Sequence, residues 1–303
     1  MGAYMLIFVL TLVGGIGTIC RKNYAKDNIN VKHALNLYML IAHPLAAVYF
    51  LIMAGGQVPL NMTSFWFSFV YAWICMASML FTMLAYDRIN LIYISVFSGA
   101  GAMVVPFAYD LICGVRFSVY NYIAVALRIA AVLVPLAFNK TKNRGLIICI
   151  ILFFVSGAAG IIPKIYGAWQ GVVSDESFCF WTNIVILPIV VVLILSQLKN
   201  GKKTNEDAHQ ATGRFRELWD DTKKIKVSGY IYIMIATLTA NIGSLASIGI
   251  MRMVSPTVYA ILSSSMGLFV TAAISRFIYK EEIKKKEIIS LALSVGAVVL
   301  GVF

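Results

Sequence analysis

A single arginine inside an apolar segment has the clearest chemical potential in this sequence. Arg128 stands between Tyr122 and Pro135 in a run without other charged residues, where a guanidinium is costly unless it is paired or faces a watery cavity. It could attract an anionic group, such as a substrate carboxylate. It could equally form a structural ion pair with Asp110 in the preceding segment, the nearest acid, which sits about 9 Å shallower by helical rise. Both interpretations stay open from sequence.

A histidine and two asparagines in other apolar segments also allow both a functional and a structural interpretation. His43 precedes Pro44, and a proline within a helix frees backbone carbonyls, so the imidazole could take part in proton coupling. It could also be hydrogen-bonded between helices, because polar side chains hold membrane helices together. Asn183 and Asn241 allow the same two interpretations.

Hydroxyl and aromatic side chains complete the candidates. Ser98 and the pair Ser263 and Ser264 occupy equivalent places in two apolar segments; small residues there let helices approach closely, and their hydroxyls could also meet a ligand. Aromatic residues near segment ends could wall a cavity, although such positions are also typical of the membrane interface. The candidate substrate-binding residues lining a central cavity are His43, Trp73, Tyr86, Tyr93, Ser98, Arg128, Asn183, Asn241, Tyr259, Ser263 and Ser264.

The sequence offers little for a metal site or for enzymatic catalysis. It has three histidines and five scattered cysteines, without an HExxH or CxxC pattern, so zinc would have few ligands. No apolar segment brings His, Asp, Glu or Cys together at one depth. We therefore expect no metal, no cofactor and no enzymatic activity.

Long apolar runs must position these side chains. The chain is 60% hydrophobic and only 13% charged, whereas a soluble domain carries roughly 25% charged residues. Each run has the roughly 17 to 25 residues that a membrane helix needs, which predicts an all-α integral membrane protein with ten transmembrane helices and the lipid bilayer as partner. The runs cover 2–20, 34–54, 64–86, 90–112, 118–138, 145–166, 178–198, 227–251, 255–279 and 287–303.

The positive charges lie between the runs and are distributed unequally. Odd-numbered connections carry 21 of the 25 Lys and Arg residues, and even-numbered ones carry two. This distribution argues against a nucleic-acid partner in spite of the net charge of +12. By the positive-inside rule, we expect a multi-pass protein of the plasma membrane with its odd-numbered loops in the cytoplasm.

Two halves of the chain follow the same pattern. Gly14, Gly17 and Arg21 recur as Gly157, Gly160 and Lys164 at an offset of 143, and Pro44 recurs as Pro188 at 144. The offset becomes 166 beyond the charged segment 199–226, which we interpret as an insertion between spans seven and eight, either a surface amphipathic helix or a solvated linker. Residues 1–144 and 145–303 are thus two five-helix repeats, inverted because five is odd. Candidate helix-packing or gating residues are Gly14, Gly17, Pro44, Gly157, Gly160 and Pro188.

This organisation resembles the drug/metabolite transporter superfamily, specifically its ten-helix EamA-type members. The resemblance covers the whole chain and rests on the helix count, the glycine-bearing first helix of each half with its cation, the 253–260 segment, and the turn with Glu281 before a last helix rich in small residues. Val115 stands where the family usually has Glu, and the family's cytoplasmic termini oppose the charge distribution. The resemblance implies export or exchange of small metabolites without ATP.

These observations favour a secondary transporter of small metabolites, such as amino acids, drugs or related compounds. Inverted repeats permit alternating access around a site at their interface near the membrane midplane. An alternative is a non-transporting membrane module that presents the 199–226 loop to a partner. An integral-membrane enzyme is disfavoured by the lack of clustered catalytic groups. The substrate, the coupling ion, and the choice between monomer and homodimer stay open.

Overall fold

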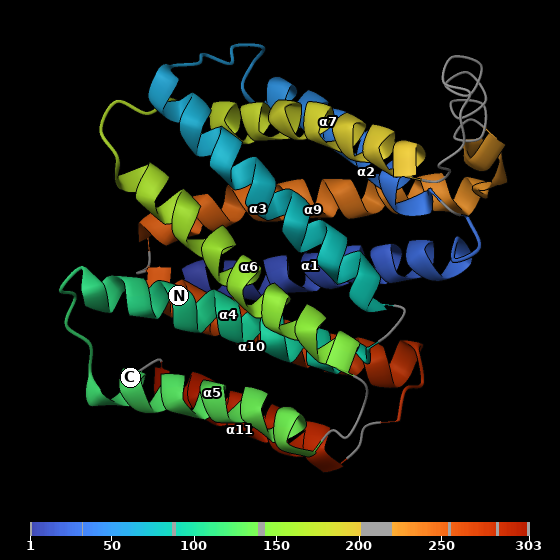
Figure 1. Cartoon of the computed structure of the whole chain (residues 1–303). Coiled ribbons are helices and arrows are strands. Elements are labelled where there is room, and N and C mark those ends of the chain that lie inside the picture. The colour runs from blue at the N-terminus through green and yellow to red at the C-terminus, as the bar shows by residue number, and fades with distance from the viewer. Residues whose placement is uncertain are drawn as a thin grey trace. The chain divides into compact units, whose positions relative to one another are not determined.

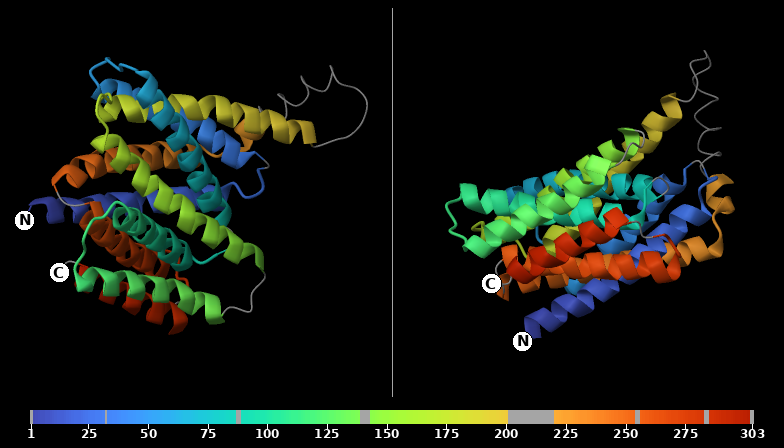
Figure 2. Two further views of the ribbon diagram at one scale, coloured as in Figure 1. Left: turned by 60° about the vertical axis from the view of Figure 1, so that its left-hand side comes forward. Right: turned by 90° about the horizontal axis from the view of Figure 1, so that it is seen from below.

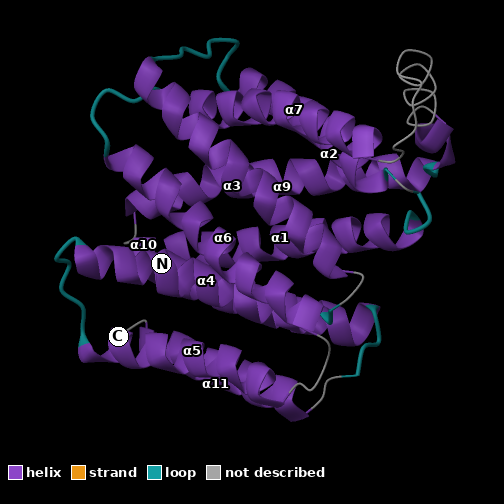
Figure 3. Cartoon of the chain, in the orientation of Figure 1, coloured by secondary structure: helices purple, strands orange, loops and turns teal. Residues whose placement is uncertain are grey.

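The described residues of the computed structural model form helices joined by loops, with no strand among them (Figure 3). The structure describes residues 2–31, 33–86, 89–138, 143–200, 220–253, 256–282 and 285–301. Eight of its helices are long and apolar enough to cross a membrane. The prediction of a helical, multi-pass membrane protein is therefore supported at the level of fold class.

The helix bounds follow the predicted runs with local differences. The helices are α1 (Gly2–Asp27), α2 (Ala34–Met53), α3 (Met62–Tyr86), α4 (Leu91–Ile112), α5 (Val119–Phe138), α6 (Asn143–Ala168), α7 (Asp175–Asn200), α9 (Val227–Met253), α10 (Pro256–Ala273), the π-helix η1 (Ile274–Ile278) and α11 (Lys285–Gly301). Eight helices meet the length and hydropathy of a span, and two further apolar helices, Val119–Val134 and Glu287–Ala297, cover 10–17 of the described residues each. A count of ten spans therefore stays a prediction.

Short local motifs define the two ends of α4. The Asn90 side chain accepts a hydrogen bond of 3.3 Å from the backbone N–H of Ile92 and so caps the start of α4. At the other end of α4, Gly114 has φ of 82°, a left-handed conformation that glycine adopts without steric cost. Val115 N–H then returns to the carbonyl of Asp110, which closes the helix end.

Unit 1, as we name the larger compact part of the chain, comprises Met1–Ile16, Ile74–Val172 and Ile242–Phe303. Within it, α4 packs against α5, α6 and α10, and α5 packs along α11. Figure 1 and the two views of Figure 2 show α5 and α11 side by side. Helix α4 is thus the central element of unit 1.

Glycines bring α4 and α6 into backbone contact. A Cβ added at Gly101 would lie 1.8 Å from the backbone oxygen of Phe153, and one added at Gly157 would lie 2.4 Å from Val105. Gly160 lies against Pro106 at an ordinary contact distance of 3.4 Å. Gly101 and Gly157 therefore permit a helix separation that any larger residue would prevent, whereas a Cβ would fit at Gly160.

In α1 the close contact belongs to a neighbour of the predicted glycine. A Cβ at Gly14 would meet no atom within 4 Å, whereas one at Gly15 would lie 2.6 Å from Val270 of α10. Gly17 lies close to Thr239 of α9, with 2.5 Å between its added Cβ and Oγ1. The packing role predicted for Gly14 therefore falls on Gly15, one residue along the helix.

Unit 2, the smaller compact part, comprises Gly17–Trp73 and Val173–Asn241. Here α2 packs against α7, and both helices continue through their internal prolines, Pro44 and Pro188, which are exposed. Each of the two units therefore combines segments from both predicted sequence halves.

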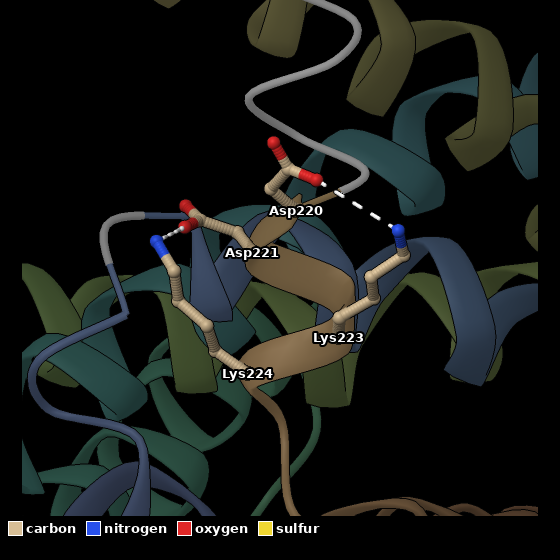
Figure 4. Close-up of polar contacts among 4 residues, drawn as sticks. All are labelled: Asp220, Asp221, Lys223 and Lys224. Carbon is tan, nitrogen blue, oxygen red and sulfur yellow. Dashed lines mark hydrogen bonds and ion pairs between the residues drawn. The ribbon is translucent and has the colours of Figure 1, made fainter.

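The charged segment 199–226 is described at its two ends. Residues 201–219, which include most of the predicted amphipathic or linker segment, lie outside the described residues. Residues 220–224 form a helical turn before α9, in which Lys224 pairs with Asp221 at 2.8 Å and Lys223 with Asp220 at 3.9 Å (Figure 4). Asp221 and Ile225 are buried, so this end of the charged segment is anchored by packing, and the choice between amphipathic helix and linker for the rest stays a prediction.

Candidate binding site around Arg128

Arg128 occupies a polar layer between two apolar clusters of unit 1. One turn before it, Ala124 and Val125 of α5 pack with Met103, Phe107, Ile261 and Ala297. One turn after it, Val132 packs in a second cluster with Ile92, Val96, Phe97, Ala100, Cys149, Leu268 and Ala272. The side chain of Arg128 is completely buried, with 0% exposure. Its charge is thus removed from solvent on both sides along the helix.

Helices α4 and α10 meet the guanidinium from the side. A Cβ added at Gly99 of α4 would lie 2.4 Å from Arg128 Nη2, 3.4 Å from the Ser264 Cβ and 3.5 Å from the Ser264 backbone oxygen. Gly99, Arg128 and Ser264 therefore converge from three helices. Only glycine at position 99 leaves the guanidinium its present place.

The guanidinium has no hydrogen-bond partner among the residues that the structure describes. Its Nε, Nη1 and Nη2 atoms are all buried and unpaired there. Burial of an unpaired charge is strongly unfavourable. The site consequently holds a positive charge whose partner is not supplied by the described helices.

Asp110 is paired elsewhere, which contradicts the sequence-based alternative of an Arg128–Asp110 ion pair. Its carboxylate forms a salt bridge with Lys164 of α6, and the Lys164 Nζ also lies 5.8 Å from the centroid of the Tyr109 ring. Asp110 is 11 residues beyond Gly99 on α4, or about 16 Å by helical rise. The distance along α4 therefore separates Asp110 from the guanidinium.

The predicted serines are bonded within their own helices. The hydroxyl of Ser98 donates to Ser95 O at 3.5 Å, that of Ser263 to Ala260 O at 3.5 Å, and that of Ser264 to Ile261 O at 3.2 Å. Such bonds cover hydroxyl protons in an apolar helix. Because these hydroxyl protons are already bonded, the hydrogen-bond donors still available in the polar layer are the N–H groups of Arg128.

A second polar pair lies in unit 2. His43 Nδ1 and Asn183 Oδ1 are 2.8 Å apart, and Asn183 Nδ2 donates to Cys179 O at 2.9 Å. Because the amide nitrogen is the donor to Cys179, Oδ1 is the acceptor and His43 Nδ1 carries the hydrogen. The pair is an interhelical hydrogen bond, and the buried His43 Nε2 has no partner among the described residues.

The remaining candidates do not join either pair in the contacts described. Asn241 is buried in unit 2, and its Nδ2 has no partner within the described chain. Trp73 is 48% exposed. Tyr86 packs beside the cluster of Ala85, Ile94, Ile148 and Leu152, Tyr259 packs beside that of Ile7, Ile250 and Leu262, and Tyr93 is buried in α4.

A polar network at one end of unit 1 was absent from the sequence prediction. Asn90 donates to Glu287 Oε1 at 3.3 Å, and the Ser275 hydroxyl approaches both Asn90 Oδ1 at 3.4 Å and Glu281 Oε2 at 2.5 Å. Glu287 and Ser275 are buried. The only sequence signal was the cap-forming Asn90 before an apolar run, which gives no indication of its partners.

Over the described ranges, no three His, Cys, Asp or Glu residues are grouped to hold a metal.

Comparison with known proteins identifies a fold. No protein-family model and no curated protein matches this sequence. A crystal structure described only as that of a protein is similar over 97% of this chain and 98% of the other, with a TM-score of 0.53 and 12% sequence identity. The chain therefore has, along nearly its whole length, a fold similar to one solved by crystallography, and the likeness shows the fold alone.

Proposed function

We propose that this chain is a secondary transporter that moves small metabolites, such as amino acids, drugs or related compounds, by alternating access. The observation that carries the proposal is a pattern of helix pairing. Helix α2 packs against α7, α4 against α10, and α5 against α11. Under the predicted repeat, the members of each pair are counterparts. Contacts between counterparts are expected where helices surround a pseudo-two-fold axis.

Two glycine contacts in unit 1 support the predicted register. Gly157 of α6 lies against Val105 of α4, and Gly15 of α1 lies against Val270 of α10. Gly157 follows Gly15 by 142 residues, and Val270 follows Val105 by 165. Both offsets are within one residue of the 143 and 166 read from the sequence landmarks. The two contacts therefore behave as copies of one contact.

A transporter also needs polar groups in its apolar interior that folding does not use. Arg128 meets this requirement because its guanidinium is buried without a partner among the described residues. The His43–Asn183 pair adds a second polar location, where the buried imidazole Nε2 has no partner in the described part of the chain. Since buried polar groups in membrane helices commonly mark substrate or ion pathways, these two locations are the first to examine for transport.

Transport is tested with purified protein in liposomes. We expect accumulation or counterflow of at least one labelled compound from a panel of amino acids, nucleotides, carboxylates and cationic dyes, with protein-free liposomes as the control. Lack of uptake and of counterflow for every class, in protein shown to be folded and inserted, would refute the proposal.

Membrane orientation requires a separate measurement. The proposed topology places residues 139–144 in the cytoplasm, so single cysteines introduced there should escape an impermeant thiol reagent in intact cells. Labelling without permeabilisation would reverse the orientation and leave the transport proposal in place.

The alternative role as a module that presents the 199–226 loop predicts that transport is absent and that deletion of 201–219 abolishes partner binding.

A further inference from the structure

We propose that Arg128, in the layer formed with Gly99 and Ser264, is the counter-charge for a monoanionic group, carboxylate or phosphate, on the transported molecule. The inference rests on the proposed transport function and names its substrate class. It starts from a fully buried guanidinium whose three nitrogens have no partner in the described part of the chain.

Packing alone does not account for the charge at position 128. The α5–α11 contact is held close by a hydrogen bond of 2.6 Å from the Ser290 hydroxyl to Ala131 O. Apolar residues of α5 fill the clusters one turn before and one turn after Arg128. An aliphatic side chain in this layer would avoid the cost of charge burial. The packing of the described residues therefore gives the guanidinium no role, which favours a role in ligand binding.

The charges of the surrounding helices specify an anion. Lys164, on the helix α6 that packs against α4, is engaged by Asp110. Arg128 therefore contributes one uncompensated positive charge to the layer, which matches one negative charge. Its planar fork of N–H donors can bind a carboxylate or a phosphate oxygen pair through two parallel hydrogen bonds.

Gly99 sets the approach to this group. The guanidinium rests against α4 at Gly99, where Ser264 of α10 is also close, so separation of α4 and α10 at this point would give an anion a route to Nη2. Separation of packed helices is the kind of movement that alternating access requires. A methyl at position 99 would occupy this place and displace the guanidinium.

The first experiment measures anion binding in detergent, without transport. The thermal midpoint of the purified full chain is recorded against the monoanions lactate, benzoate and dimethyl phosphate and, as a non-anionic control, ethanolamine. We expect the midpoint to rise with at least one anion and not with ethanolamine. Arg128→Met should weaken that effect at least tenfold in concentration, Arg128→Lys should retain part of it, and Arg116→Gln, which changes an exposed arginine, should leave it intact.

The midpoint without anion separates this proposal from a structural role. If Arg128 serves an anion, Arg128→Met should unfold at the same temperature as wild type or higher, because an unpaired buried charge has been removed. A lower midpoint together with unchanged anion dependence would overturn the proposal. Stabilisation by an anionic phospholipid, with no effect of any soluble anion, would identify a lipid headgroup as the ligand and would also overturn it.

The second experiment distinguishes the site from the function. Soluble anion binding that depends on Arg128, without flux in liposomes, would retain the site and refute transport. Flux of an anion that Arg128→Met leaves unchanged would retain transport and refute the site. Loss of anion flux in Arg128→Met, with Arg116→Gln unaffected, supports both.

Discussion

Gly101→Ala tests how closely α4 and α6 must pack. The added Cβ would lie 1.8, 2.6 and 2.8 Å from the oxygen, carbonyl carbon and Cα of Phe153. All three atoms belong to a helix backbone, so no rotamer change relieves the clash. An ordinary contact of at least 3.4 Å requires α6 to retreat by about 1.6 Å, and a gap of even ~1 Å already forfeits up to about half of each dispersion contact.

The expected cost is about 3 kcal/mol, the upper part of the usual range for overpacking. Gly267→Ala is the matched control, because Gly267 also lies within a helix packed on α4 and its Cβ would meet no atom within 4 Å. That substitution should be neutral or stabilising by up to about 1 kcal/mol. The two variants should therefore differ by about 3–4 kcal/mol, which corresponds to roughly 6–8 °C at ~2 °C per kcal/mol.

The assay is the midpoint of heat-induced loss of the monodisperse peak in detergent, for the two variants and wild type side by side. Equal midpoints for Gly101→Ala and Gly267→Ala would show that α4 and α6 do not approach through Gly101, and would refute the packing argument.

Three further substitutions test individual polar contacts by the same thermal assay. Lys164→Met should destabilise by about 1–3 kcal/mol, because it leaves the buried Asp110 carboxylate without its cation, and adding Asp110→Asn should restore most of the loss; a double variant no better than the single one would argue against the pair. Asn183→Ala should cost about 1 kcal/mol through loss of its hydrogen bond to the imidazole, and an unchanged midpoint would contradict that bond. Asp220→Asn should change stability by less than about 0.5 kcal/mol, since its pair is exposed, whereas Asp221→Asn, at a buried position, should have the larger effect; the reverse order would refute our account of this turn.

The hydropathy pattern predicts the bounds of a helix well where the whole helix is apolar, and less well where the helix extends beyond its apolar run. The run at 34–54 corresponds closely to α2, whereas α1 continues to Asp27, seven residues beyond the predicted run. Hydropathy indicates which residues favour lipid, and a helix can continue into polar residues beyond that limit. The position of Arg128 inside an apolar segment indicated that its side chain would be either paired or facing a polar cavity, because a charge in such a segment is costly to leave exposed to lipid.

The partners of charged and polar residues were less predictable. Asp110 pairs with Lys164, and this choice depends on which face of α4 meets α6. That face is determined by Gly101 and Gly157, whose role depends on backbone separation and leaves no trace in hydropathy. The network of Asn90, Ser275, Glu281 and Glu287 joins residues up to 197 positions apart, so only the packed fold reveals it.

A fixed positive charge in α5 also has an electrical consequence. Under the proposed transport mechanism, a monoanion that neutralises Arg128 would let the loaded protein change conformation without moving net charge at this site. The same change without the anion carries one positive charge through part of the membrane field, which is worth about 2.3 kcal/mol per 100 mV for a complete crossing. Exchange of one anion for another should therefore be insensitive to voltage, whereas net flux should depend on it.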